Sequence, residues 1–134
     1  MPIVWNESLS VKVKEIDQQH RKLIALITSL EEAMSKGRGK DVLGKVLGEL
    51  VEYTKQHFAF EEKLMVAHQY PELAQHRQKH FSLTQQVLEL QIKQAAGQAA
   101  LTIPTMSFLN SWLTEHIQNV DKKFGAYLNS KGVS

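Results

Sequence analysis

Apolar side chains recur every three or four positions along most of this chain, which is the spacing of one face of an α-helix. Four separate stretches show this spacing, and each defines one seam of inward positions. The seams are His20, Leu23, Ile27, Leu30 and Met34; Leu43, Leu47, Leu50, Thr54, His57, Glu61 and Leu64; Leu73, His76, His80, Leu83, Val87 and Leu90; and Met106, Leu109, Leu113, His116 and Val120. Four helices joined by short loops predict an all-α protein, an up-down-up-down antiparallel four-helix bundle.

Local signals predict where these helices begin and end. Asp17 is a good N-cap for the first helix, and the Gly37-Arg38-Gly39 turn ends that helix. Pro71 suits the first turn of the third helix. The remaining boundaries are predicted from about Asp41 to about Ala67 for the second helix, at Ala95-Ala96-Gly97-Gln98 for the end of the third, and near Ile103-Pro104 for the start of the fourth.

The chain divides into a short arm and one bundle. Residues 1–16 precede the first helical pattern and predict an extended N-terminal arm packed on the bundle. Residues 17–130 predict a single domain, because 134 residues are enough to bury a real core. The apolar side chains of the arm that can cover this core are Trp5, Leu9, Val11, Val13 and Ile16.

Composition excludes several classes of function. The net charge of +2 is small and both signs are interspersed, which argues against a nucleic-acid partner. The absence of cysteine excludes disulfides, thiolate metal sites and cysteine nucleophiles. The longest aliphatic run, Leu23–Ile27, is far too short to span a bilayer, and Met1–Val13 is unlike a secretory signal. We therefore expect a cytoplasmic protein without stable membrane insertion.

Polar residues on the predicted seams point to a specific site. Five of the six histidines, together with Glu61, occupy positions where leucine would be expected. A buried polar group without a partner costs roughly 1–3 kcal/mol, and a buried unpaired carboxylate costs several. Six such groups would cancel about 5–15 kcal/mol, the whole stability of a domain. These groups must therefore have partners.

The same residues are also predicted to lie at one end of the bundle. In an antiparallel bundle the start of the first and third helices meets the end of the second and fourth. His20, His57, Glu61, His76, His80 and His116 then all fall within roughly three turns of that end. His68 lies off the seam and is interpreted as a surface or turn histidine.

Imidazole and carboxylate groups without sulfur suit iron, manganese, zinc, copper or nickel. Five imidazoles exceed what one catalytic zinc normally takes, so two ions are favoured. A second carboxylate is then needed to help bridge them, and Asp121 and Asp17 are the candidates. Asp121 is five residues after His116, about 140° off its helical face, so the fourth helix would have to unwind or bulge there.

Taken together, these residues resemble the hemerythrin family over nearly the whole chain. The matching features are Trp5 in the arm, Asp17-Gln18-Gln19-His20, His57-x3-Glu61, His76-x3-His80 and His116-x4-Asp121. The resemblance implies two iron ions bridged by an oxo or hydroxo group and by Glu61 and Asp121, one iron held by His76, His80 and His116 and the other by His20 and His57. It also implies one vacant position, on the iron with two histidines, where dioxygen binds.

The function implied by the resemblance is reversible dioxygen binding by an oxygen carrier, storage or delivery protein that is not an enzyme. We expect a monomer that hands oxygen to an oxygen-consuming enzyme. Reversibility requires a dry pocket, because water or protons reaching the bound oxygen would leave oxidised iron. The candidate wall, of which Leu113 is the best placed, is Leu23, Phe58, Trp112, Leu113 and Ile117; ordinary core packing explains each of these residues equally well.

Two other function classes stay open at this point. The first is a sensor of oxygen, nitric oxide or redox state, although 134 residues leave no room for a fused signalling module. The second is a di-iron oxidase, peroxidase or iron-storage protein. Bundles of that kind use Glu-x-x-His motifs, and no histidine here has a glutamate three residues before it.

Overall fold

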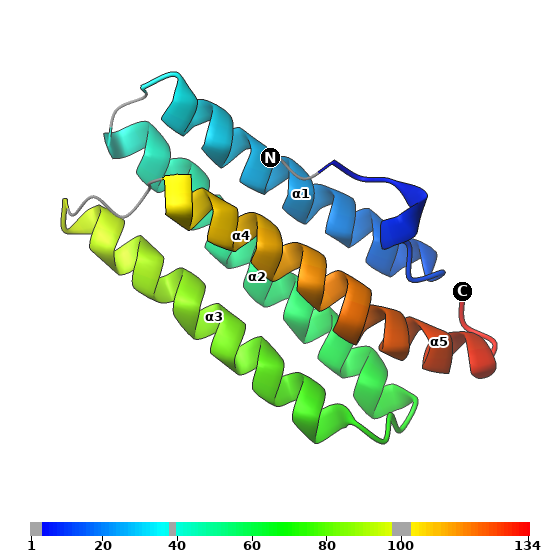
Figure 1. Ribbon diagram of the computed structural model, residues 1–134. Helices are drawn as coiled ribbons and strands as arrows, with labels where there is room; N and C mark the ends of the chain where they lie inside the picture. The colour runs from blue at the N-terminus through cyan, green and yellow to red at the C-terminus, as the bar shows by residue number, and fades with distance from the viewer. Residues whose placement is uncertain (1–3, 38–39, 98–102) are drawn as a thin grey trace.

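The computed structural model describes residues 4–37, 40–97 and 103–134, and these residues form helices and no strands. The prediction of an all-α protein is confirmed. The elements in chain order are a 3₁₀ helix Glu7–Leu9, α1 Lys14–Ser35, α2 Lys40–Ala67, α3 Leu73–Ala95, α4 Ile103–Glu115, a π-helical segment His116–Asp121 and α5 Lys122–Ser130 (Figure 1).

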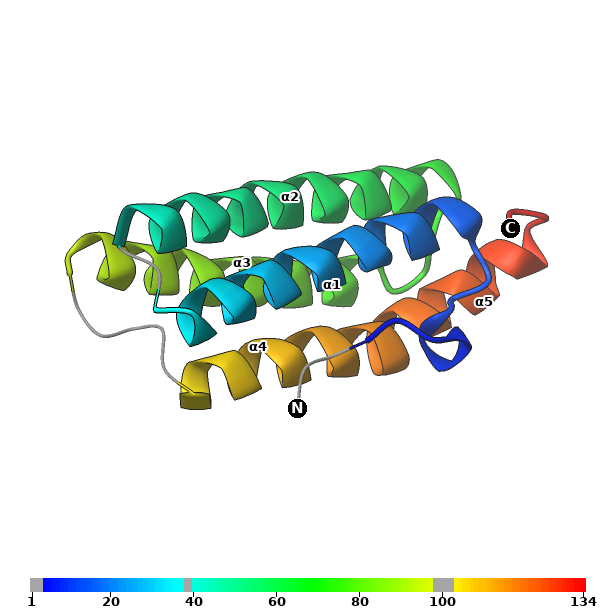
Figure 2. The same ribbon diagram turned by 90° about the horizontal axis from the view of Figure 1, so that it is seen from above.

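The helices pack as the predicted antiparallel four-helix bundle. Three of its rods are α1, α2 and α3, and the fourth is made of α4, the π-helical segment and α5, which follow one another nearly in line (Figures 1 and 2). None of the helices in the described ranges combines the length and apolar character needed to cross a membrane.

The predicted seams are the faces that the bundle buries. In the half of the bundle away from the histidines, five aliphatic side chains on the seams of α1, α2 and α4 are fully buried: Ile27, Leu30, Leu47, Leu50 and Leu109. The α3 seam is less deeply buried, since Leu73, Leu83 and Leu90 are only half-buried while Gln94, outside the predicted seam, is 8% exposed. The core therefore rests mainly on α1, α2 and α4.

Two predicted helix starts are wrong. Helix α1 begins at Lys14 with Val13 as its N-cap, so Asp17 lies inside the first turn and is not a cap. Its carboxylate instead accepts hydrogen bonds from Ser10 Oγ at 2.6 Å and from the Val11 amide at 2.9 Å. Helix α3 begins at Leu73, so Pro71 lies in the turn before it. Asp17 thus fastens the arm to α1.

The arm packs on the bundle, and it is not extended throughout because it contains the 3₁₀ helix. Its contact with α5 is close at Gly125, where an added Cβ would lie 2.2 Å from the Val11 carbonyl oxygen. A side chain at that position would collide with the backbone of the arm. The arm side chains Leu9, Val11 and Val13 are buried, and Trp5 is half-buried. The predicted arm boundary at residue 16 is wrong, because the buried Ile16 lies in α1.

The turn between α2 and α3 is held by the fourth rod. Gln69 has a φ of 55°, and its left-handed conformation ends α2. The Tyr127 hydroxyl from α5 donates to the carbonyls of His68, at 2.6 Å, and Gln69, at 3.1 Å. His68 is half-buried in this turn, consistent with its interpretation as a turn histidine. The predicted turn residues Arg38 and Gly39, the predicted end of α3 at Gln98 and arm residues 1–3 lie outside the described ranges.

Candidate metal centre

The seven side chains predicted as metal ligands lie together inside the bundle, and the most exposed of them is His116 at 6%. They form two overlapping sets in which one ligand atom from each residue lies within 4.8 Å of the others. The sets are Glu61, His76, His80, His116 and Asp121, and His20, His57, Glu61 and Asp121. Glu61 and Asp121 belong to both sets.

The Glu61 carboxylate lies between the two groups of histidines. Its Oε1 is 3.1 Å from His80 Nε2 and 3.8 Å from His76 Nε2. Its Oε2 is 3.4 Å from His57 Nε2 and 3.7 Å from His20 Nε2. One oxygen therefore faces each set.

The Asp121 carboxylate is placed in the same way from the opposite rod. Its Oδ1 is 3.1 Å from His76 Nε2 and 3.2 Å from His116 Nε2. Its Oδ2 is 2.9 Å from His20 Nε2. The two carboxylates are thus the shared members of a five-residue set and a four-residue set.

Helix geometry explains how three of the rods present two ligands each, while α1 supplies only His20. His57 and Glu61 lie four residues apart in α2, as His76 and His80 do in α3, and residues at this spacing share a face of an α-helix. His116 and Asp121 lie five apart, and here the chain is a π-helix, whose hydrogen bonds join residues five apart. This is the bulge that the sequence spacing required. Asp17, the other candidate carboxylate, is bonded to the arm and does not belong to either set.

The charges in the cluster depend on one another. Burial alone would raise the pKa of Glu61, and so would its neighbour Asp121, but the surrounding histidines lower it to about 2. Burial likewise opposes ionisation of Asp121, yet His116, His20 and His76 hold its pKa well below the ordinary value. Burial would lower the pKa of His57 and of His116, but the two carboxylates raise both. Without a metal, protons on His57 and His116 help to compensate the buried carboxylates.

The cluster fits a metal because many of its polar atoms have no hydrogen-bond partner. These buried atoms are His20 Nδ1 and Nε2, His57 Nε2, both oxygens of Glu61, His76 Nδ1, His80 Nε2, His116 Nε2 and Asp121 Oδ2. Leaving a buried polar group unsatisfied costs about 1–3 kcal/mol. Imidazole nitrogens and carboxylate oxygens are ligands that iron accepts, and bound ions would satisfy these atoms.

Three residues near the cluster were given no role from the sequence alone. Gln19 Oε1 lies 2.6 Å from His57 Nδ1, and Glu62 Oε2 lies 2.9 Å from His80 Nδ1. Arg77 Nε donates to Glu62 Oε1 at 3.1 Å. Gln19 and Glu62 stand directly beside His20 and Glu61 in the chain, a step of about 100° around the helix, so they face a neighbouring helix and do not lie on the seam.

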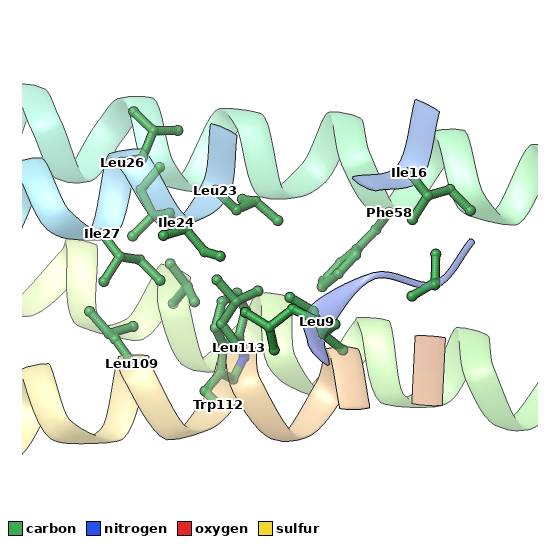
Figure 3. Close-up of a cluster of buried hydrophobic side chains, with 14 of the residues drawn as sticks. Leu9, Ile16, Leu23, Ile24, Leu26, Ile27, Phe58, Leu109, Trp112 and Leu113 are labelled. Carbon is green, nitrogen blue, oxygen red and sulfur yellow. The ribbon is translucent and has the colours of Figure 1, made fainter. Parts of the chain in front are cut away.

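Phe58 has the closest ring contacts with the cluster among the five predicted wall residues. Its ring stacks on His80 with centroids 3.9 Å apart and also lies near His57 and His116, at 5.8 and 5.5 Å. Figure 3 shows Phe58 directed from α2 into the space between the helices, with Leu113 and Trp112 on the α4 side. Leu23, Leu113 and Ile117 are almost completely buried.

Trp112 differs from the other wall residues because it also borders solvent. A cleft of about 400 Å³ lies between α3 and the fourth rod, and its lining includes Trp112, His116, Leu83 and Phe108. The Trp112 side chain is nevertheless only 5% exposed. It therefore stands at the boundary between this cleft and the buried side chains.

Comparison with known proteins agrees with this arrangement. The family model described as the hemerythrin HHE cation binding domain matches residues 11–128. The chain belongs to the hemerythrin family. Its relatives include a bacteriohemerythrin of Stenotrophomonas maltophilia, 34% identical with 95% of this chain and 84% of the relative covered. A bacteriohemerythrin of Methylococcus capsulatus is 32% identical, with 85% and 86% covered.

The solved structures agree with the relatives. The crystal structure of a wild-type hemerythrin superposes with a TM-score of 0.89 at 30% identity, covering 96% of this chain and 98% of that one. Both the predicted resemblance and the predicted fold are therefore confirmed. The family match and the buried cluster of histidines and carboxylates together support a di-iron, oxygen-binding domain.

Proposed function

We propose that this protein binds dioxygen reversibly at a non-haem di-iron centre and acts as an oxygen carrier, store or delivery protein. The observation that carries the proposal is the pair of overlapping ligand sets sharing Glu61 and Asp121, one with three histidines and the other with two. Sharing suits two neighbouring ions, and unequal histidine numbers suit two ions with different tasks. When bound, such an iron pair supplies two electrons to dioxygen and takes them back on release.

We assign the ligands from the distances in the cluster. His76, His80 and His116 would hold one iron, and His20 and His57 the other. Glu61 and Asp121 would bridge the irons, with an oxo or hydroxo group as third bridge, since each carboxylate turns one oxygen toward each histidine group. The iron with two histidines has one protein ligand fewer, and we place oxygen binding there.

The chain's own contribution to reversibility is the exclusion of water. The apolar side chains around the cluster keep protons away from bound oxygen, and this is the step that separates release from permanent oxidation. Phe58 stacks on the ring of His80 and lies near the rings of His57 and His116, and Leu113 and Ile117 are buried in the fourth rod beside His116. Trp112 would separate this dry volume from the cleft between α3 and α4.

Five histidines against two carboxylates distinguish this cluster from the carboxylate-rich sites of ferritin-like di-iron proteins, which carry Glu-x-x-His motifs. This composition supports oxygen binding over oxygen activation. We further propose that the protein acts as a monomer and without enzymatic activity, releasing oxygen to an oxygen-consuming enzyme.

An oxygen titration of the reduced protein tests the proposal. The iron-loaded protein is reduced anaerobically, titrated with oxygen and followed by absorption spectroscopy. We expect two irons per chain and a visible band that appears with one oxygen per iron pair and fades under vacuum over repeated cycles. Continued oxygen consumption in the presence of a reductant would instead identify an oxidase. A single iron per chain would reject the two-iron assignment.

A further inference from the structure

The outer nitrogens of two ligand histidines make hydrogen bonds of different character. His57 Nδ1 lies 2.6 Å from the amide oxygen of Gln19 in α1, and His80 Nδ1 lies 2.9 Å from the carboxylate of Glu62 in α2. Gln19 is neutral and Glu62 carries a negative charge. The two histidines belong to different ligand sets. Each set therefore has one histidine with a polar side-chain partner outside the cluster.

These contacts fix which nitrogen of each ring is free to bind a metal. A carboxylate accepts hydrogen bonds and does not donate them, so His80 Nδ1 must carry the proton that it shares with Glu62. The Gln19 amide oxygen imposes the same tautomer on His57. In the neutral form of both rings, which is the form that binds a metal, the Nε2 without a proton then faces the interior, where it is buried and has no hydrogen-bond partner.

Glu62 is held firmly in this role. Its Oε2 accepts a hydrogen bond from His80 Nδ1 at 2.9 Å, and its Oε1 accepts one from Arg77 Nε at 3.1 Å. Arg77 and His80 lie three residues apart in α3, so both donors reach Glu62 from the same helix. The carboxylate is thereby oriented across the α2 and α3 contact, although 24% of its side chain remains exposed.

We propose that Glu62 and Gln19 are positioning residues that make the two metal sites unequal. This inference rests on the proposed di-iron function. A carboxylate partner draws the Nδ1 proton and increases the basicity of Nε2, which strengthens the bond of that histidine to a metal. Because the more highly charged ferric ion gains more from a basic ligand, Glu62 favours ferric iron in the three-histidine site. Neutral Gln19 orients His57 without this bias.

The consequence is that the two metal sites would have different tasks. The two-histidine site, where we place oxygen binding, would keep a more weakly donating ligand shell and a higher reduction potential than the three-histidine site. The three-histidine site holds its metal more firmly. The difference arises from residues that touch the ligands and not the metals.

Variants that change charge and hydrogen bonding separately test this inference. Glu62→Gln keeps an acceptor and removes the charge, Glu62→Ala removes both, and Gln19→Glu adds a charge to the other site. Glu52→Gln is the matched control, since Glu52 is an exposed carboxylate of the same helix. Zinc affinity is measured by competition with a chelator, and the midpoint potential of the iron-loaded protein by a redox titration with Mössbauer spectra that resolve the two irons.

We expect Glu62→Ala to weaken zinc binding at one site about 10- to 100-fold, the usual effect of losing such a partner. Glu62→Gln should retain more of the zinc affinity than Glu62→Ala and should raise the reduction potential of the iron in the three-histidine site. Gln19→Glu should lower the reduction potential of the iron in the two-histidine site. The inference is overturned if the Glu62 variants shift affinity and potential no more than Glu52→Gln does.

Zinc affinity keeps this test separate from the proposed function. If the wild-type protein fails to bind oxygen reversibly while the Glu62 variants still lose zinc affinity, the proposed function fails and the positioning role stands. If oxygen binds reversibly and zinc affinity is unchanged in every variant, the proposed function stands and the positioning role fails.

Discussion

Oδ1 of Asp121 lies 3.2 Å from Nε2 of His116, although five residues separate the two in the chain. In a regular α-helix these side chains would point about 140° apart. The π-helical segment His116–Asp121 brings them onto one face, and both side chains are buried. A local departure from α-helical geometry therefore completes the cluster.

We expect Asp121→Asn to reduce the iron content from two per chain to one or none. The substitution removes the charge of a carboxylate whose oxygens face both histidine groups, and an amide is a much weaker bridge between two ions. Iron per chain is measured by elemental analysis of protein loaded anaerobically. Asp17→Asn is the control, because Asp17 bonds to the arm and should leave both irons in place. Equal iron losses in the two variants would contradict the choice of Asp121.

His57→Ala and His80→Ala should have different effects. His57 belongs to the two-histidine set, so its removal should abolish reversible oxygen binding while one iron is retained. His80→Ala should affect the three-histidine iron first. Mössbauer spectra and oxygen titrations distinguish the two losses. Full reversible binding in the His57 variant would show that the ligands are allocated wrongly.

Leu113→Ala should accelerate autoxidation at least severalfold, because it opens space for water one turn before His116. Leu109→Ala is the matched control: Leu109 is equally buried in the same helix and one turn farther from the cluster. Both substitutions should lower the free energy of unfolding by about 2–5 kcal/mol. Only Leu113→Ala should change the decay of the oxygenated absorption band, and equal decay rates in both variants would remove Leu113 from the pocket wall.

Gly125→Ala should destabilise the protein by about 1–3 kcal/mol, a typical effect of overpacking. The new Cβ would meet the Val11 carbonyl oxygen at 2.2 Å, so the arm would have to move. Gly48→Ala is the control within α2, where the nearest atom beyond the helix is a side-chain nitrogen of Gln91 at 3.6 Å. That substitution should stabilise the protein by about 0.5–1 kcal/mol. Chemical denaturation measures both, and a neutral Gly125→Ala would mean that the arm contact has little energetic weight.

The metal-free protein should lose stability on both sides of a mildly acidic window. Burial opposes the charge of His57 and His116, but the carboxylates raise both pKa values above 6.5, so this contribution is present below pH 6.5 and is lost as pH rises through the raised values. Despite burial, the pKa of Glu61 is lowered from 4.5 to about 2, so its contribution is lost as pH falls from 4.5 toward 2. Bound metal replaces the histidine protons and should remove the alkaline loss. Thermal unfolding of metal-free and loaded protein at pH 5.5 and 8 checks this, and a metal-free protein more stable at pH 8 would contradict it.

The sequence predicted those features that follow from helical periodicity. The four seams, the shared end of the bundle and the need for a bulge between His116 and Asp121 are all visible in residue spacing. The prediction of Asp17 as an N-cap was wrong because an aspartate near the start of a helical pattern looks the same in the sequence in both cases. It can cap the helix, or it can accept hydrogen bonds from a preceding arm. Gln19 and Glu62 could not be identified, since their importance arises from contacts with neighbouring helices.

The need for glycine at position 125 could not be predicted for a similar reason, because only the packed arm shows that no side chain fits there. The tertiary contacts of single residues thus mark the limit of what periodicity can predict.

The half of the bundle that contains Ile27, Leu30, Leu47, Leu50 and Leu109 does not depend on an ion, since the side chains that it buries are mainly aliphatic. A chain built this way can fold first at the aliphatic end of the bundle, and the end that carries the ligands can close later. Iron would then bind to a bundle that is already folded. It would stabilise the end that carries the ligands and would not be needed to start folding.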